Sequence, residues 1–96
     1  MRVEYSKRAL ADINRIATYY RTVASEAVVA EIEDRIRDVI QRIAELPDSA
    51  PQSPERPGLR AALLIRYPFR IFYRVVDGRI QIVHIRHTAR RSFASE

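Results

Sequence analysis

The stretch "RYPFRIFYRVVDGRIQIVHIRHTARR", residues 66–91, contains two runs of aromatic and β-branched residues on either side of Asp77-Gly78. Such runs are typical of β-strands, and an Asp-Gly pair is a preferred two-residue turn of a tight hairpin. The stretch therefore predicts a β-hairpin in which Val76 pairs with Arg79.

This pairing assigns each side chain to one of two faces, because successive residues of a strand point to opposite sides of a sheet. The first face is mostly apolar and suits a core: Phe69, Ile71, Tyr73, Val75, Ile80, Ile82, His84 and Arg86. The second face carries Arg70, Phe72, Arg74, Gln81, Val83 and Ile85. Two arginines flanking an aromatic ring suit an anion or a nucleotide, although arginines on a solvated strand also serve solubility.

Two helices are predicted before the hairpin, after a short first strand around Val3 and Tyr5. Ser6 is a favourable N-cap for a helix over residues 7–21, and Ser25 for a second helix that ends near Leu46. The apolar residues of both helices recur at spacings of three and four, which places them on one stripe. The stripes comprise Leu10, Ile13, Ala17 and Tyr20 in the first helix, and Val29, Ile32, Ile36, Val39, Ile43 and Leu46 in the second.

The segment Pro47–Gly58 contains four prolines and predicts a surface crossover, which leads into a further strand within residues 59–66. The elements together predict one α+β domain over residues 1–96, in the order β-α-α-β-β-β. In this domain a helix hairpin packs on one face of a small, mainly antiparallel sheet.

Composition limits the possible functions. The sequence has no cysteine, so we expect neither disulfides nor thiolate metal sites, and its two histidines lack metal-like spacing. We expect no metal and no cofactor. The start of the chain has no hydrophobic signal segment, and no apolar run reaches the length of a membrane span, so we expect a cytoplasmic protein without membrane association.

Charge is divided unevenly along the chain. Residues 1–55 contain 8 basic and 10 acidic side chains, a net charge of −2, whereas residues 56–96 contain 9 arginines and 2 acidic residues, a net charge of +7. A basic half of this kind favours an anionic partner. The candidate target-binding residues are Arg66, Arg70, Arg74, His87, Arg90 and Arg91.

The histidines and tyrosines allow more than one interpretation. His84 is predicted to be a hydrogen-bonded, partly buried imidazole rather than a catalytic residue. His87 follows the last strand beside several arginines, where it could act as an acid or base at a phosphodiester or only donate hydrogen bonds and pack. Tyr67 is predicted to be open to a partner. Core or boundary positions are predicted for Tyr5, Tyr19, Tyr20 and Tyr73.

The order of elements, together with "PGLR", "YPFRIFYRVVDG" and "IVHIRHTARR", resembles the toxins of the RelE/ParE superfamily from type II toxin–antitoxin systems. The resemblance covers nearly the whole chain and is strongest over residues 58–90, where it favours the ParE, or plasmid-stabilisation, branch. It implies a toxin held inactive by a cognate antitoxin, whose acidic segment wraps the toxin and folds on binding. ParE-like members are associated with poisoning DNA gyrase, which implies an inhibitor that acts by binding rather than an enzyme.

Two alternatives remain at this stage. RelE-like members of the superfamily cleave mRNA on the ribosome, and a metal-independent endoribonuclease of that kind would use Arg66, Arg70, Arg90 and His87. The C-terminal tyrosine of the RelE pattern has no counterpart here, and Glu96 stands roughly in its place. The second alternative is a basic nucleic-acid-binding module without catalysis.

Overall fold

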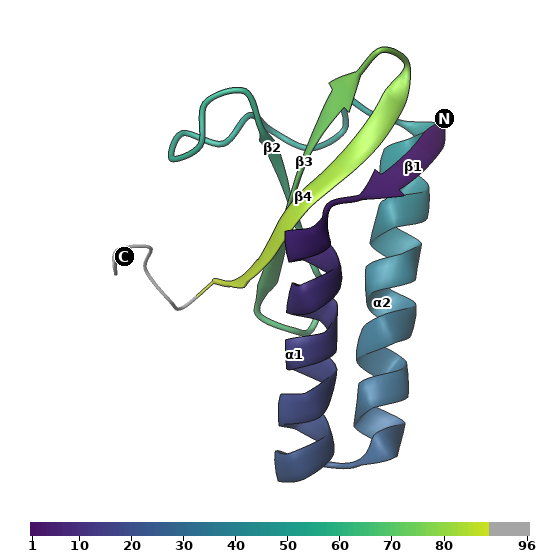
Figure 1. The fold of residues 1–96 in the computed structure, drawn as a ribbon, viewed down its shortest axis with the longest axis vertical. Coiled ribbons are helices and arrows are strands. Elements are labelled where there is room, and N and C mark those ends of the chain that lie inside the picture. The colour runs from purple at the N-terminus through teal and green to yellow at the C-terminus, as the bar shows by residue number, and fades with distance from the viewer. Residues whose placement is uncertain (89–96) are drawn as a thin grey trace.

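Two helices cover one face of a four-stranded sheet in the computed structural model, which describes residues 1–88 (Figure 1). The elements are β1 (Arg2–Tyr5), α1 (Lys7–Val23), α2 (Glu26–Glu45), β2 (Arg60–Leu63), β3 (Phe69–Val76) and β4 (Arg79–His87). The strands lie in the order β1-β4-β3-β2, and only the β1–β4 pair is parallel. The predicted α+β fold and its element order are confirmed.

Both predicted helix starts are confirmed by their capping bonds. The Ser6 hydroxyl accepts a hydrogen bond from the Ala9 amide at 2.9 Å, and the Ser25 hydroxyl accepts one from the Val28 amide at 3.2 Å. These bonds satisfy amides that have no partner within the first turn of a helix. α1 extends two residues beyond the predicted end at Arg21, and the two helices form the predicted hairpin.

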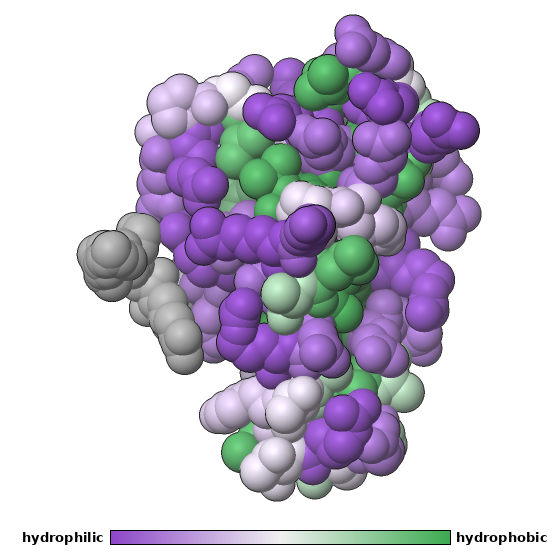
Figure 2. Space-filling view, viewed as in Figure 1, coloured by the Kyte–Doolittle hydropathy of each residue, from purple (hydrophilic) through white to green (hydrophobic). Residues whose placement is uncertain are grey.

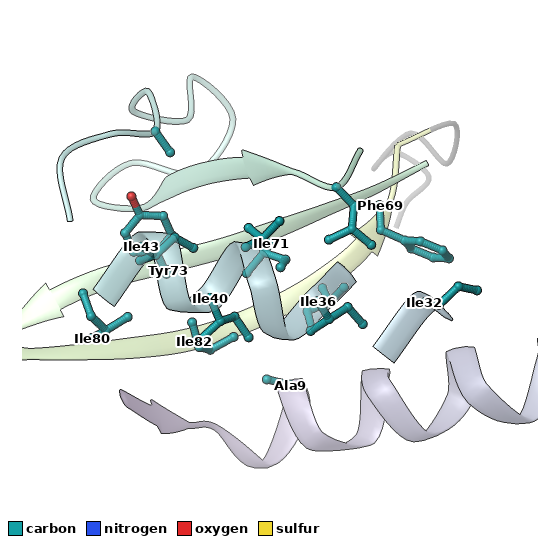
Figure 3. Packing of buried hydrophobic residues seen from close by; sticks show 14 residues of the cluster. Ala9, Ile32, Ile36, Ile40, Ile43, Phe69, Ile71, Tyr73, Ile80 and Ile82 are labelled. Carbon is teal, nitrogen blue, oxygen red and sulfur yellow. The ribbon is translucent and has the colours of Figure 1, made fainter. Parts of the chain in front are cut away.

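The hydrophobic core lies between α2 and the helix-covered face of the sheet. Figure 3 shows Ile36, Ile40 and Ile43 of α2 beside Ile71 and Ile82 of the central strands. Each of these side chains is at most 5% exposed, and complete burial of an isoleucine contributes roughly 1.5–3 kcal/mol. Burial of these side chains is therefore the main contribution to the stability of the fold.

Tyr73 closes one end of this core. Its side chain is fully buried, and its hydroxyl donates a hydrogen bond to the Pro47 carbonyl at 2.7 Å. Burial raises the pKa of the Tyr73 hydroxyl above its usual value. The bond joins β3 to the first residue of the proline-rich loop.

The apolar stripe of α1 is displaced from the predicted one. Leu10 is 55% exposed and Tyr19 is 59% exposed, so the predicted inward positions of both residues are wrong. The helix instead buries Ala9, Asp12 and Ala17, with Ile13, Ile16 and Tyr20 partly buried beside them. Leu46 is 59% exposed because it follows the last residue of α2, and Tyr5 is 41% exposed on the outermost strand.

The β3–β4 hairpin follows the predicted register only in its outer half. Asp77 and Gly78 have φ values of 51° and 73°, as a turn with two left-handed residues requires, and Val76 pairs with Arg79. The register then shifts between Phe72 and Tyr73, so that Phe72 lies opposite His84 and β4 contains one extra residue. This is a β-bulge, which reverses the faces of the residues beyond it.

Because of the bulge, the predicted sheet faces of three residues in β4 are wrong. Ile85 belongs to the core cluster, although the regular pairing placed it on the second face. His84 and Arg86 lie on the face away from the helices, opposite Phe72 and Arg70, although the regular pairing placed them in the core. Ser6, the residue before α1, binds the edge of β4 at the bulge: its hydroxyl donates a hydrogen bond to the Val83 carbonyl at 2.8 Å.

The proline-rich loop passes around the edge of β2. Ala50 belongs to the core, and the Ala61 amide donates to the Pro51 carbonyl at 3.0 Å. The loop then projects beside β2, away from the helices (Figure 1). A bond from the Ser53 amide to the carbonyl of Leu59, the residue before β2, closes the loop at 2.8 Å. The crossover thus covers part of an edge that would otherwise be open to pairing.

Candidate target-binding face

The face of the sheet opposite the helices, called the far face below, carries two of the predicted arginines. Arg70 and Arg74 flank Phe72 on β3, as predicted. The Arg74 guanidinium is exposed, and its Nε donates to Gln81 Oε1 at 2.6 Å. Arg70 is partly exposed and, among residues 1–88, has no ion pair within 4.0 Å. Two cations are therefore available to a partner at this face.

Phe72 is fully buried, which contradicts the prediction of an open aromatic platform. The guanidinium carbons of Arg86 and Arg56 lie 5.1 and 5.5 Å from the centre of its ring, close enough for cation–π attraction. The His84 ring stacks on the same residue at 5.9 Å, with 14° between the two planes. Within residues 1–88, the far face is consequently a layer of cations over the buried Phe72 ring, which is not exposed for a base to stack on it.

A glutamate of the proline-rich loop lies among these cations. Arg86 Nη2 donates to Glu55 Oε1 at 2.6 Å. This hydrogen bond, together with the charges of Arg86, Arg70 and Arg56, holds the pKa of Glu55 below its usual value. Neither Glu55 nor Arg56 was expected from the sequence, because only the path of the loop brings them to the far face.

His84 has the hydrogen-bonded, buried environment that was predicted for it, although on the other face. Its Nδ1 lies 2.7 Å from Asp12 Oδ2, which also accepts the Ile85 amide at 3.0 Å. Its Nε2 lies 3.4 Å from Arg8 Nη2, and Asp12 Oδ1 accepts from Arg15 at 3.2 Å. Its three partners, the His84 ring, the Ile85 amide and Arg15, make Asp12 the link between α1 and β4 at the bulge.

Sequence reasoning missed Asp12, although its position carried a signal. It lies one turn from Ala9 and next to Ile13, on the side of α1 that faces the sheet. A carboxylate on the buried stripe of a helix requires buried hydrogen-bond donors nearby. The bulge supplies one of them, because it leaves the Ile85 amide on the strand edge that β1 does not reach.

Arg66 and His87 lie apart from the two far-face arginines. Arg66 occupies the turn between β2 and β3 with a φ of 79°, and its Nη1 donates to Glu31 Oε2 of α2 at 3.0 Å. His87 lies opposite Phe69, with 5.3 Å between the ring centres. Because Phe69 is a core residue, His87 points to the helix-covered side. Arg90 and Arg91 lie outside the described residues.

Tyr67 is partly buried, packs against the core and is less open than predicted. Desolvation and a hydrogen bond to Glu31 raise the pKa of its hydroxyl.

Polar residues cover most of the surface seen in Figure 2, with smaller apolar patches between them. Within residues 1–88, neither helix is long and apolar enough to cross a membrane.

This sheet with its helix hairpin occurs in toxins of toxin–antitoxin systems. A chain of the chromosomal ParDE system from P. aeruginosa matches with a TM-score of 0.82 and 25% identity, over 91% of this chain and 95% of that one. The intact E. coli RelBE toxin–antitoxin complex contains a chain that matches with a TM-score of 0.60 and 16% identity, over 94% and 98%. The fold is therefore that of the RelE/ParE class.

Sequence comparisons define the family within this class. Toxin RelE2 of Caulobacter vibrioides is 34% identical over 92 residues, which cover 92% of this chain and 96% of the relative. The family model described as the ParE toxin of the type II toxin–antitoxin system, parDE, matches residues 3–92. The chain belongs to this ParE toxin family and is a toxin of a type II toxin–antitoxin system.

Proposed function

We propose that this toxin inhibits growth by binding DNA gyrase. The observation that carries the proposal is the match to the ParE family model over residues 3–92, and gyrase poisoning is the activity that resemblance to ParE toxins implies. The structural likeness supports the same branch, with a TM-score of 0.82 to the ParDE chain against 0.60 to the RelBE chain. The proposed target-binding residues are Arg66, Arg70, Arg74, His87, Arg90 and Arg91.

The positions of these residues support binding rather than catalysis. A nuclease needs its phosphate-binding and proton-transferring groups around one scissile bond. Arg70 lies on the far face, whereas Arg66 bonds to α2 and His87 points to the helix-covered side. A binding surface places no such demand on its cations, since each can contact a different part of a partner.

Ribosome-dependent mRNA cleavage is the second candidate, because the C. vibrioides relative is named RelE2. In that function Arg66, Arg70 and Arg90 would hold phosphates, and His87 would act as acid or base without a metal. A basic module that binds nucleic acid through stacked bases has less support, since Phe72 is fully buried.

A cognate antitoxin is the proposed second partner, and the cytoplasm is the proposed site of action. The similar structures belong to the ParDE and RelBE toxin–antitoxin systems. The net charge of +7 over residues 56–96 suits an acidic antitoxin segment that becomes ordered on the toxin.

The double variant Arg70→Ala/Arg74→Ala should lose toxicity while it remains folded. Both side chains lie on the far face outside the core, and loss of a charged hydrogen bond typically costs about 1–3 kcal/mol of binding free energy. Growth after induction, with expression and circular dichroism checked in parallel, measures the effect.

The matched control is Arg21→Ala/Arg37→Ala, which removes the same charge from exposed positions on the helices. It should remain toxic. Equal toxicity of the two double variants would place the effector surface elsewhere than the far face.

A further inference from the structure

Glu55 is the only acidic residue shown to interact with Arg86 among the residues that the structure describes. Its carboxylate is 45% exposed and lies on the proline-rich loop, whereas the Arg86 side chain is only 16% exposed. An ion pair whose acid is so exposed adds little to stability. Glu55 can therefore leave Arg86 without unfolding the sheet beneath it.

Arg86 has a donor that Glu55 does not use. Its Nε is buried and has no hydrogen-bond partner among residues 1–88, while Nη2 bonds to Glu55. Nε and Nη2 present their hydrogens along one edge of the guanidinium, which is the edge that a carboxylate can bind with both oxygens. A buried donor without a partner is unfavourable, so a carboxylate that reached both nitrogens would bind better than Glu55 does.

Two further cations surround this position. Arg56 and Arg86 both lie over the Phe72 ring, which restricts where their guanidinium groups can point. Arg70 lies directly opposite Arg86 in the sheet, and its charge acts on the Glu55 carboxylate. Arg86 thus contacts the Glu55 carboxylate directly, and the charges of Arg56 and Arg70 act on it from neighbouring positions.

We propose that Arg56, Arg70 and Arg86 form a carboxylate-binding site for an acidic segment of a protein partner, and that Glu55 occupies this site until the partner displaces it. A peptide carboxylate fits better than a nucleic acid, because the present occupant is a carboxylate and Phe72 is not exposed for base stacking. The inference rests on the proposed role of the far face in binding, to which it adds an internal competitor.

Glu55→Gln tests the competition directly. The amide keeps the size of the side chain and removes its charge, so the three arginines should bind an external carboxylate about fivefold more tightly, given the modest strength of an exposed ion pair. The probe is a fluorescently labelled hexaglutamate peptide, and binding to the purified full chain is measured by fluorescence anisotropy at about 0.1 M salt, where the Debye length is about 10 Å.

Glu33→Gln is the matched control, because it makes the same charge change at an exposed position of α2. It should leave the affinity within about twofold of the parent, since exposed charges more than a Debye length apart are screened. Arg86→Gln should abolish the gain in a Glu55→Gln background. Circular dichroism melting of every variant separates loss of the site from loss of the fold.

A labelled six-residue thymidine oligonucleotide serves as the second probe. Equal affinities of the Glu55→Gln and Glu33→Gln proteins for hexaglutamate would overturn the proposal. So would a Glu55→Gln gain that appears for the oligonucleotide and not for the peptide, because the site would then take a phosphodiester. These experiments measure peptide binding and not toxicity. The carboxylate-binding site can therefore prove wrong while the far face is still needed for toxicity. Conversely, the site can bind the peptide while the far face proves unnecessary for toxicity.

Discussion

Ile36→Asp is expected to unfold the protein. Ile36 is 4% exposed and lies on the side of α2 that packs against the sheet. The substitution removes an apolar side chain and places a carboxylate among the apolar side chains of the core cluster. The expected loss exceeds about 4 kcal/mol, whereas the whole stability of a small domain is about 5–15 kcal/mol. Circular dichroism with thermal and urea denaturation measures the loss.

Gln41→Asp is the matched control on the same helix. Gln41 is exposed, so aspartate there changes only local helix propensity, an effect of less than about 1 kcal/mol. The two variants should differ widely in melting temperature. If the Ile36→Asp protein were folded and had the same melting temperature as the Gln41→Asp protein, α2 would not face the sheet as described.

The second large effect is expected for Asp12→Ala. The aspartate is 4% exposed and accepts bonds from the Ile85 amide, Arg15 and the His84 ring. Alanine leaves a buried amide and a buried imidazole nitrogen without partners, which should lower the free energy of unfolding by about 3 kcal/mol. Urea denaturation monitored by circular dichroism measures this change.

Asp34→Ala serves as the comparison for that variant. Asp34 also pairs with an arginine three residues further along its helix, at 2.7 Å, but both side chains are 69% exposed. Its loss should cost less than about 0.5 kcal/mol. If the two alanine variants were equally stable, Asp12 would not be the link between α1 and β4.

Local patterns predicted most of the fold. In α2, five of the six predicted stripe residues are buried, because a helix packed on a sheet has a single inward side and an unbroken apolar period marks it. Asp77-Gly78 predicted the turn and the register up to Tyr73, since both positions adopt left-handed backbone angles. In α1 the inward side includes a small residue and an aspartate, so hydrophobicity alone misplaced Leu10.

The far face could be predicted only in part. Arg70 and Arg74 follow from the alternation of β3, which stays regular. His84 and Arg86 were assigned to the wrong face, because a bulge adds one residue and no local pattern around Val83 indicates it. Glu55 and Arg56 reach this face through the path of a long loop, which composition does not specify.

The two target hypotheses are separated most directly by expressing the toxin in cells without antitoxin and assaying gyrase-linked DNA breakage and cleavage of ribosome-bound mRNA in parallel. The Arg70→Ala/Arg74→Ala variant is included as the folded, weakly binding reference. The proposed function predicts DNA breakage that falls in this variant, with ribosome-bound mRNA left intact. Cleaved mRNA together with undamaged DNA would contradict gyrase as the target and identify the protein as a ribosome-dependent endoribonuclease.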